Sequence, residues 1–177
     1  STAAKFNAVL VGPATCTGLG ISPGDNRIVA GFGASGYYHS TDGTTWTNFT
    51  PTINAAGDVL NQCLCILPFR SRLIVFNTNE GPINVDFPQR IRWAAIGNPL
   101  TATAWRDDII GQGGFLDIPT AENIVSVGFV RDNLVIYCER STWQLRYTGR
   151  SIAPFQIEKV NSELGAESTF SAVQFDT

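Results

Sequence analysis

The segment Arg70-Ser71-Arg72-Leu73-Ile74-Val75-Phe76 contains a pattern that recurs in this chain: a polar turn leads directly into a run of apolar residues. Two other segments repeat this order, Asp25-Asn26-Arg27-Ile28-Val29-Ala30 and Arg131-Asp132-Asn133-Leu134-Val135-Ile136-Tyr137. An apolar run also precedes each polar triplet, which predicts that each triplet is the tip of a β-hairpin. Similarity between segments of one chain is typical of folds built from repeated units.

Helical periodicity is hard to find along the chain, whereas short runs with the two-residue period of strands recur from end to end. Turns rich in Gly, Pro, Asn and Asp separate these runs, which predicts antiparallel meanders. The predicted strands are residues 6–11, 27–30, 61–67, 73–76, 90–94, 124–130, 134–138 and 143–147. The sequence therefore predicts an all-β protein.

Each predicted hairpin is followed by a third strand in which polar and apolar residues alternate, at residues 37–40, 90–93 and 143–147. A short fourth strand is expected around an aromatic residue, Trp46, Trp105 or Phe155. The first two strands of each unit are nearly continuous apolar runs, as expected for strands buried on both faces, whereas the later two would meet water. This gradient fits a β-propeller blade, in which sheets pack face to face around an axis.

The spacing of Ile28, Leu73 and Leu134 is close to the roughly 40 to 50 residues of a propeller blade, provided that the second unit has an insertion at 78–89. The expected fold is thus all-β and β-propeller-like, with about three four-stranded antiparallel blades plus the start of a fourth. The blades are expected at about 5–50, 59–110 and 121–161, and the next blade is expected to begin at 165–177.

Three blades cannot close a ring, because propellers typically have about four to eight. Residues 1–177 are therefore expected to form a partial propeller. Either a neighbouring protein completes it or, as we prefer, the rest of a longer polypeptide does. A β-sandwich with the same number of strands is the competing architecture.

Hydrophobic residues make up 44% of the chain and charged residues 15%, so the chain can bury a core beneath a sparsely charged surface. The formal net charge of -3 argues against a protein that grips phosphates, because Lys and Arg are not in excess. No apolar run approaches the roughly 18 residues that span a bilayer, so no membrane anchor is expected.

The cysteines, Cys16, Cys63, Cys65 and Cys138, are too scattered for a disulfide framework, and the single histidine, His39, offers little support for a metal site. Cys63 and Cys65 lie two positions apart, so their side chains are expected to leave the same face of a strand. The cysteines are expected to be buried free thiols. No metal or other cofactor is predicted.

The segment Ser40-Thr41-Asp42-Gly43-Thr44-Thr45-Trp46 resembles, in a shortened spacing, the Asp-box of sialidase-type and related propellers. Asp42 can accept backbone N–H bonds in the turn, Gly43 can take a positive φ, and Trp46 can pack back over the hairpin. The resemblance implies a structural role for Ser40, Asp42, Gly43 and Trp46 and says little about chemistry.

A second resemblance comes from Asp86-Phe87-Pro88-Gln89-Arg90-Ile91-Arg92-Trp93-Ala94, which is followed by Trp105, and from an apolar strand that ends in Glu139-Arg140-Ser141 before Trp143. These segments resemble the β-propeller tail proteins of short-tailed bacteriophages, the nozzle or tail-hub subunits. Residues 60–177 carry the resemblance, and residues 1–60 match only as another blade. The motif residues are Arg90, Arg92, Trp93, Trp105, Arg140 and Trp143.

The second resemblance implies a virion structural protein in the phage tail that is made in the host cytoplasm and self-associates in a ring. Its expected partners are other tail proteins, such as an adaptor, fibre or hub. Exposed edges and the segment 78–89 are expected to dock these neighbours. The mild acidity of the chain would let DNA pass along the conduit without specific binding, because like charges repel.

The alternative is a carbohydrate-binding or glycoside-hydrolysing Asp-box propeller. Hydrolysis needs a paired acid and nucleophile, but the neighbours Asp107-Asp108 and Glu139-Arg140 would point to opposite faces of a strand. A sialidase-like arginine cluster would have to come from Arg90, Arg92, Arg140 and Arg146. Solvated arginines or interface ion pairs are the preferred interpretation of these four residues. We therefore predict a protein that is not an enzyme and assign no catalytic residue.

Overall fold

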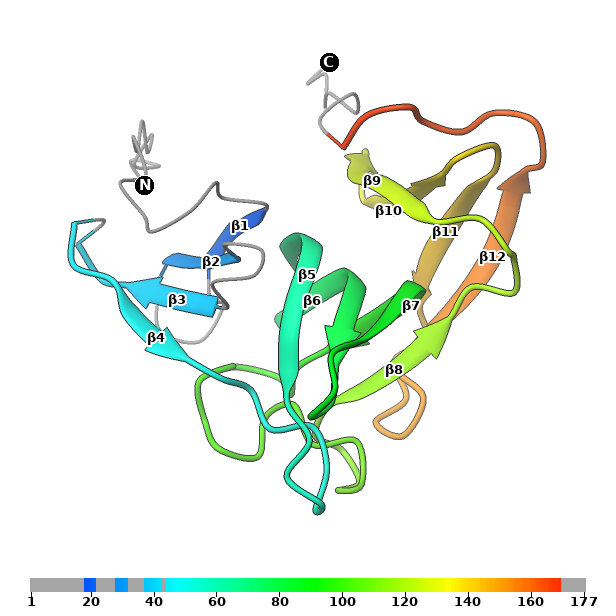
Figure 1. Cartoon of the computed structure of the whole chain (residues 1–177). Coiled ribbons are helices and arrows are strands. Elements are labelled where there is room, and N and C mark those ends of the chain that lie inside the picture. The colour runs from blue at the N-terminus through cyan, green and yellow to red at the C-terminus, as the bar shows by residue number, and fades with distance from the viewer. Residues whose placement is uncertain (1–17, 22–27, 32–36, 43, 170–177) are drawn as a thin grey trace.

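The computed structural model describes residues 18–21, 28–31, 37–42 and 44–169. These residues form three sheets of four antiparallel strands, and no helix occurs among them (Figure 1). The predicted all-β class is therefore confirmed for the described residues. They contain no helix that could span a membrane.

In each sheet the strands pair in chain order, so each sheet is an up-and-down meander. The first sheet consists of β1 (Gly18–Ile21), β2 (Ile28–Gly31), β3 (Tyr37–Ser40) and β4 (Thr47–Phe49). The second consists of β5 (Leu60–Phe69), β6 (Arg72–Glu80), β7 (Val85–Trp93) and β8 (Gly114–Asp117). The third consists of β9 (Ile124–Val130), β10 (Asn133–Cys138), β11 (Thr142–Tyr147) and β12 (Phe155–Asn161).

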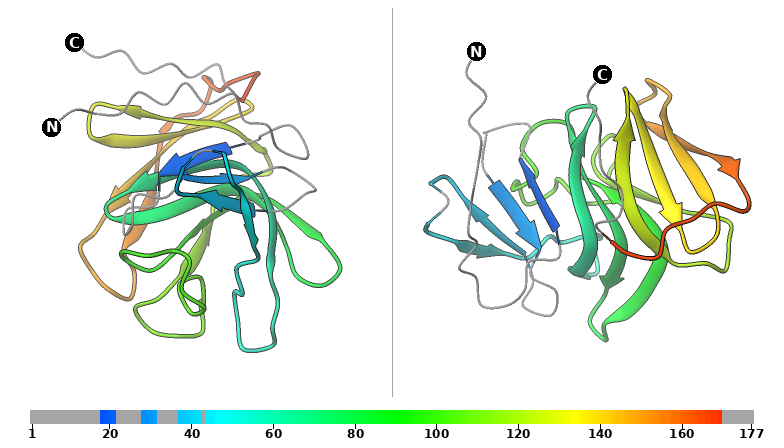
Figure 2. Two further views of the ribbon diagram at one scale, coloured as in Figure 1. Left: turned by 90° about the vertical axis from the view of Figure 1, so that its left-hand side faces the viewer. Right: turned by 90° about the horizontal axis from the view of Figure 1, so that it is seen from above.

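The three sheets stand side by side, with the second between the other two (Figures 1 and 2). The first strands lie toward one side of the molecule and the fourth strands, β4, β8 and β12, fan out on the other. β1 and β2 contact β5, and β9 contacts β5, β6 and β7. The middle sheet is thus covered on both faces.

Two apolar clusters join the sheets. Leu73 and Val75 of β6 belong to the cluster that also contains Tyr37 of the first sheet. Ile74 and Phe76 belong to the other cluster, which contains residues of the third sheet such as Leu134. Because successive side chains of a strand point to opposite faces, one apolar run serves both clusters.

Tight turns join the first two strands of the second and third sheets, as predicted. Phe69 pairs with Arg72 across Arg70-Ser71, and Val130 pairs with Asn133 across Arg131-Asp132. Arg70, Ser71 and Arg131 have φ values of 51°, 59° and 56°. The corresponding triplet of the first unit, residues 25–27, lies outside the described residues, as does the predicted strand 6–11.

The predicted position of the fourth strand of the second unit is wrong. It was expected around Trp105, but β8 at Gly114–Asp117 pairs with β7. Trp105 is buried in the loop before β8, where its indole N–H donates a hydrogen bond of 2.8 Å to the carbonyl of Pro99. The aromatic side chain marks a packed loop at this position, and the strand itself is short and only half-buried.

The predicted insertion at 78–89 is largely strand. β6 continues to Glu80 and β7 begins at Val85, so the insertion lengthens a hairpin. Pairing passes from Phe76 opposite Ile91 to Thr78 opposite Phe87, which leaves extra residues on β7. Pro88 lies in this irregular part, where a missing backbone N–H costs no ladder hydrogen bond.

Cys63 and Cys65 do not share a face, contrary to the prediction. Cys63 packs in the cluster of the first and second sheets, whereas Cys65 packs in the other cluster. On the paired strand β6, Asn77 has a φ of 54°, and the register of β6 with β7 shifts between Phe76 and Thr78. Cys63, Cys65 and Cys138 are buried and form no disulfide, as predicted, and burial raises the pKa of Cys65 to about 12. Cys16 lies outside the described residues.

The segment after β12 turns back over the third sheet without forming a strand in residues 165–169. The backbone N–H of Ala166 donates a hydrogen bond of 2.9 Å to the carbonyl of Cys138. The rest of the predicted start of a next blade, residues 170–177, lies outside the described residues.

Replacing Leu134 by Ala tests the packing of the second sheet on the third. Leu134 is fully buried, so the truncation should lower the free energy of unfolding by about 2 to 5 kcal/mol, as measured by urea denaturation. Ile110→Ala is the matched control, because Ile110 is 82% exposed, and it should change stability by no more than about 0.5 kcal/mol. Equal denaturation midpoints for the two variants would contradict this packing.

Candidate functional site

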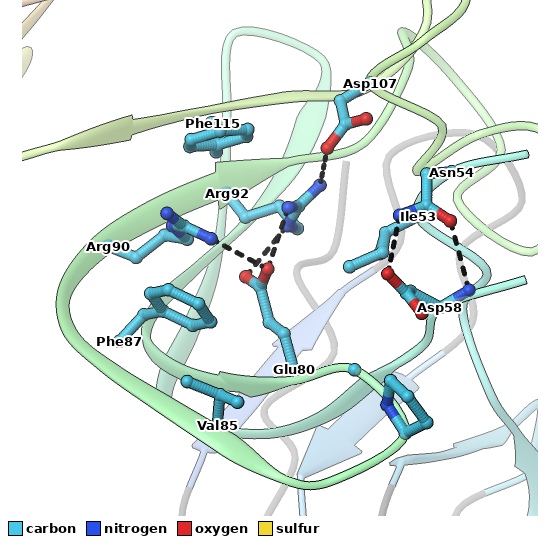
Figure 3. A pocket seen from close by; sticks show the side chains of 12 residues that line it. Ile53, Asn54, Asp58, Glu80, Val85, Phe87, Arg90, Arg92, Asp107 and Phe115 are labelled. Atoms are coloured by element: carbon cyan, nitrogen blue, oxygen red, sulfur yellow. Dashed lines mark hydrogen bonds and ion pairs between the residues drawn. The ribbon is translucent and has the colours of Figure 1, made fainter. Parts of the chain in front are cut away.

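A pocket of about 320 Å³ lies beside the long hairpin of β6 and β7 (Figure 3). Its apolar lining includes Ile53, Val85 and Phe115, and its charged lining comes from β6, β7 and the loops around them. The lining residues are Ile53, Asn54, Asp58, Glu80, Gly81, Pro82, Val85, Phe87, Arg90, Arg92, Asp107 and Phe115.

Arg92 is at the centre of the charged part of the pocket, and its side chain is only 1% exposed. Its Nε and Nη2 donate hydrogen bonds of 2.9 and 2.8 Å to the two carboxylate oxygens of Glu80. Its Nη1 donates a third, of 3.0 Å, to Asp107 Oδ2. Glu80 also accepts a hydrogen bond of 2.7 Å from Thr78 Oγ1. The bidentate contact between Arg92 and Glu80 fixes the end of β6 against β7.

Arg90 lies on the same side of β7 and joins the network from its edge. Its Nη1 donates a hydrogen bond of 3.0 Å to Glu80 Oε2, and its Nε and Nη2 each donate one of 2.8 Å to Asp117. The guanidinium carbon lies 3.7 Å from the ring centroid of Phe87 and 4.1 Å from that of Phe115. Figure 3 shows the guanidinium between the two rings, an arrangement favoured by cation–π attraction.

The electrostatics of the network keep Glu80 ionised. Burial alone would raise the pKa of Glu80, but the hydrogen bonds and positive charge of Arg92, with help from Thr78 and Arg90, outweigh it, so the pKa lies below its ordinary value. Burial would lower the pKa of Arg90, and the contacts with Asp117 and Glu80 raise it instead. The network is therefore a set of mutually stabilised charges.

Each of the two arginines already binds carboxylates of the protein itself. Arg92 binds Glu80 and Asp107, and Arg90 binds Glu80 and Asp117. A substrate anion would have to displace these partners. The arrangement is suited to locking the hairpin, β8 and the loop that contains Asp107 into one rigid unit.

The four arginines considered for a sialidase-like cluster do not come together. Arg90 and Arg92 share the pocket, whereas Arg146 is 63% exposed and pairs with Glu158 across β11 and β12. Arg140 is exposed in the turn between β10 and β11. Arg140 and Arg146 are exposed, as the preferred interpretation expects. Arg90 and Arg92 form ion pairs within the chain, and Arg92 is buried.

The turn that contains Arg140 is held by a carboxylate from outside it. Glu122 accepts hydrogen bonds of 2.9 Å from the backbone N–H groups of Arg140 and Ser141 and from the hydroxyl of Ser141. The N–H of Arg140 is the largest of several contacts that hold the pKa of Glu122 below its ordinary value. Ser141 in turn accepts a hydrogen bond of 2.8 Å from the indole of Trp143. The Glu-Arg-Ser motif thus ends one strand and orients the next.

The remaining aromatic motif residues are part of the packing. Trp93 and Trp143 are each 5% exposed and lie in the cluster between the second and third sheets. The ring centroids of Trp93 and Phe155 are 5.2 Å apart, in an edge-on arrangement. Burial of this kind indicates a structural contribution.

The segment that resembles an Asp-box forms the turn between β3 and β4. Asp42 Oδ1 accepts hydrogen bonds of 2.8 Å from the backbone N–H groups of Thr44 and Thr45, and one of 2.9 Å from Ser40 Oγ. These contacts, led by the N–H of Thr45, hold the pKa of Asp42 well below its ordinary value. Trp46 is half-buried, and Gly43 lies outside the described residues.

Sequence reasoning missed the partners of the motif residues. Glu80, Phe87, Phe115, Asp117 and Glu122 received no role, although each contacts a motif residue or its neighbour. The segment Asn79-Glu80-Gly81-Pro82 is typical of an exposed turn, so the sequence does not indicate that Glu80 is a buried carboxylate at the end of β6. Asp107 and Asp108 bind different arginines, Arg92 and Arg106.

Among the described residues, no group of three or more His, Cys, Asp or Glu side chains could hold a metal ion. Neither a protein-family model nor a curated protein matches this chain.

Replacing Arg92 by Ala should lower the free energy of unfolding by about 3 to 5 kcal/mol, because Glu80 would keep its buried charge without its main partner. Arg146→Ala is the matched control, since its ion pair with Glu158 is exposed, and it should cost less than about 1 kcal/mol. Urea denaturation of both variants measures the difference. If Arg92→Ala does not fold, Arg92→Lys keeps the charge but not the bidentate contact, and it should still lose more stability than Arg146→Ala.

Glu80→Gln tests the depressed pKa of Glu80. Because the folded-state pKa lies below the ordinary value of 4.5, the stability contributed by this carboxylate is present above about pH 4.5 and is lost as the pH falls through the folded pKa. The stability gap between the wild type and Glu80→Gln should therefore be widest near neutral pH and shrink below pH 4.5. Denaturation series between pH 3 and 7 measure the gap, and a gap that stays constant would contradict the assignment.

Proposed function

We propose that this chain is part of a larger β-propeller that serves as a structural component of a short-tailed bacteriophage tail, nozzle-like or hub-like. In this role it forms part of the wall of the DNA-ejection conduit and binds neighbouring tail subunits. The observation that carries the proposal is the stack of three consecutive four-stranded meanders, each beginning on the same side of the molecule.

The cover on both faces of the middle sheet supports a propeller over a β-sandwich. A sandwich has two sheets that bury one face each, whereas β6 places Leu73 and Ile74 in different clusters. In a propeller, every blade that has two neighbours buries both faces of its sheet in this way. The same strand order in all three sheets also supports a propeller.

The residues behind the phage resemblance support a structural role. Trp93, Trp105 and Trp143 are buried, and Arg92 is locked between Glu80 and Asp107. A motif whose residues pack and pair inside the sheets contributes stiffness, which a conduit wall needs. The DNA is expected to pass without specific binding, in keeping with the net charge of -3.

The alternative, a carbohydrate-binding or glycoside-hydrolysing propeller, draws on the turn around Asp42 and on the pocket beside Arg90. Aromatic rings and carboxylates line that pocket, as they do many sugar sites. The carboxylate of Glu80 is engaged by two arginines, however, which disfavours it as a general acid or nucleophile.

The oligomeric state and the ligand preference of the purified chain test the proposal together. Sedimentation velocity and electron microscopy should show ring-forming or otherwise self-associated particles. The chain should not shift duplex DNA in a gel at physiological salt and should not retain or cleave oligosaccharides. A stable monomer that binds or hydrolyses a glycan would overturn the structural proposal and favour the alternative.

A further inference from the structure

The second and third sheets have two ends that differ in charge. One end carries the turns after β5, β9 and β11, because Phe69 pairs with Arg72, Val130 with Asn133, and Tyr147 with Phe155. The two sheets meet at this end, where the guanidinium of Arg70 lies 6.0 Å from the ring centroid of Tyr147. The other end carries the tip of the β6–β7 hairpin, the β10–β11 turn and the segment after β12.

The first end, which we call the basic end, displays arginines around exposed apolar side chains. Ile152 is 77% exposed, Val130 is 52% exposed and Tyr147 is 43% exposed. The residues of the basic end on the turns after β5, β9 and β11 are Arg70, Arg131 and Arg150 together with Val130, Tyr147 and Ile152, and Asp132 is the acidic residue of these turns. The loop after β7 also joins this end, because the N–H of Gly97 donates a hydrogen bond to the carbonyl of Ser71. The aspartates of that loop are neutralised, Asp107 by Arg92 and Asp108 by Arg106.

Two arginines of the basic end occupy backbone positions that do not favour arginine. Arg70 and Arg131 have positive φ at equivalent turns of neighbouring sheets. Glycine adopts this conformation readily, and asparagine and aspartate tolerate it better than other residues. The guanidinium of Arg70 packs over the rings of Phe69 and Tyr147 of the chain itself. Arg131 is exposed, so its guanidinium is accessible to another molecule.

The opposite end, which we call the acidic end, combines carboxylates with exposed apolar side chains. Ile83 is 80% exposed, Leu164 is 66% exposed and Val160 is 58% exposed. The hydrogen bond from Ala166 to Cys138 holds the last segment there. The residues of the acidic end are Asp86, Glu139, Glu163 and Glu167 together with Ile83, Val160 and Leu164, and Arg140 and Lys159 are the basic residues among them.

We infer that the basic end of one copy of this chain binds the acidic end of a second copy, head to tail. The positive charge of the basic end complements the negative charge of the acidic end, and the contact would bury the exposed apolar side chains of both ends. A head-to-tail contact forms a ring when its rotation closes and a linear stack when it does not. The inference rests on the self-association in the proposed function and names the faces that would carry it.

The basic end fits a protein surface better than a nucleic acid. Tight binding to duplex DNA relies on many phosphate contacts, and this end offers few cations for the purpose. The exposed Ile152, Val130 and Tyr147 would gain little from a phosphate backbone but would be covered by Val160, Leu164 or Ile83 of another copy. Arginine and aromatic residues are also enriched in protein interfaces.

Charge reversal of each end separately, in the full chain, tests the inference. Arg70→Glu/Arg131→Glu makes the basic end acidic, and Glu163→Arg/Glu167→Arg makes the acidic end basic. Each variant alone should associate at least about tenfold more weakly than the wild type in sedimentation velocity, because like charges then face each other. An equimolar mixture of the two variants should recover association, since opposite charges face each other again. Raising the salt concentration should weaken the wild-type complex.

Arg140→Glu is the matched control, because it replaces an exposed arginine at the acidic end and should leave association intact or strengthen it. Circular dichroism of every variant checks that the fold is kept, which is expected because all substituted side chains are exposed. If both reversed variants associate like the wild type, the head-to-tail contact is wrong while self-association stands. A wild type that stays monomeric overturns both. Duplex DNA binding that disappears in Arg70→Glu/Arg131→Glu would assign the basic end to nucleic acid and overturn the contact.

Discussion

The architecture depends on the burial of both faces of the second sheet. Along β6, Leu73 and Val75 face one apolar cluster while Ile74 and Phe76 face the other, and all four are fully buried. Such a strand has no polar side, because neither face meets water. A sheet of this kind needs a partner on each side, so the chain must supply a third layer. The three meanders follow one another along the sequence, so short connections are enough to place the first and third sheets on either face of the second.

The ion network at Arg92 follows from where this apolar run ends. At Asn77 the backbone takes a φ of 54°, and the strand continues with Thr78 and Glu80, which are buried as well. Buried polar groups are costly unless they are paired. Thr78, Arg90 and Arg92 together satisfy the carboxylate of Glu80. The long hairpin can therefore bury the polar side chains of Thr78 and Glu80 at the end of β6. Loss of a partner would leave the charge of Glu80 buried and incompletely paired, which is strongly destabilising.

Strand content and the hairpin tips could be predicted from the sequence because they depend on local signals. The polar triplets at Arg70 and Arg131 and the apolar runs around them have a period that identifies them directly. The fourth strand of the second sheet could not be placed, since Trp105 gives the stronger signal but is packed in a loop. The divergence of Cys63 and Cys65 coincides with the irregular residue Asn77 on the neighbouring strand, which no local pattern predicts. The partners of Arg90 and Arg92 come from segments far along the chain, and no spacing rule links them.

Burial constrains the residues between the sheets, whereas the side chains at the turns and on the outer strands, such as Arg146 and Val160, are exposed. At these positions a substitution changes charge without disturbing the core, so selection for contacts with other molecules can act there. Arg70 and Arg131 are informative for this reason, because residues better suited to their positive φ would close the same turns with less strain. The side chains at the hairpin tips are therefore the ones that can indicate contacts with other molecules, whereas the side chains between the sheets determine only how the sheets pack.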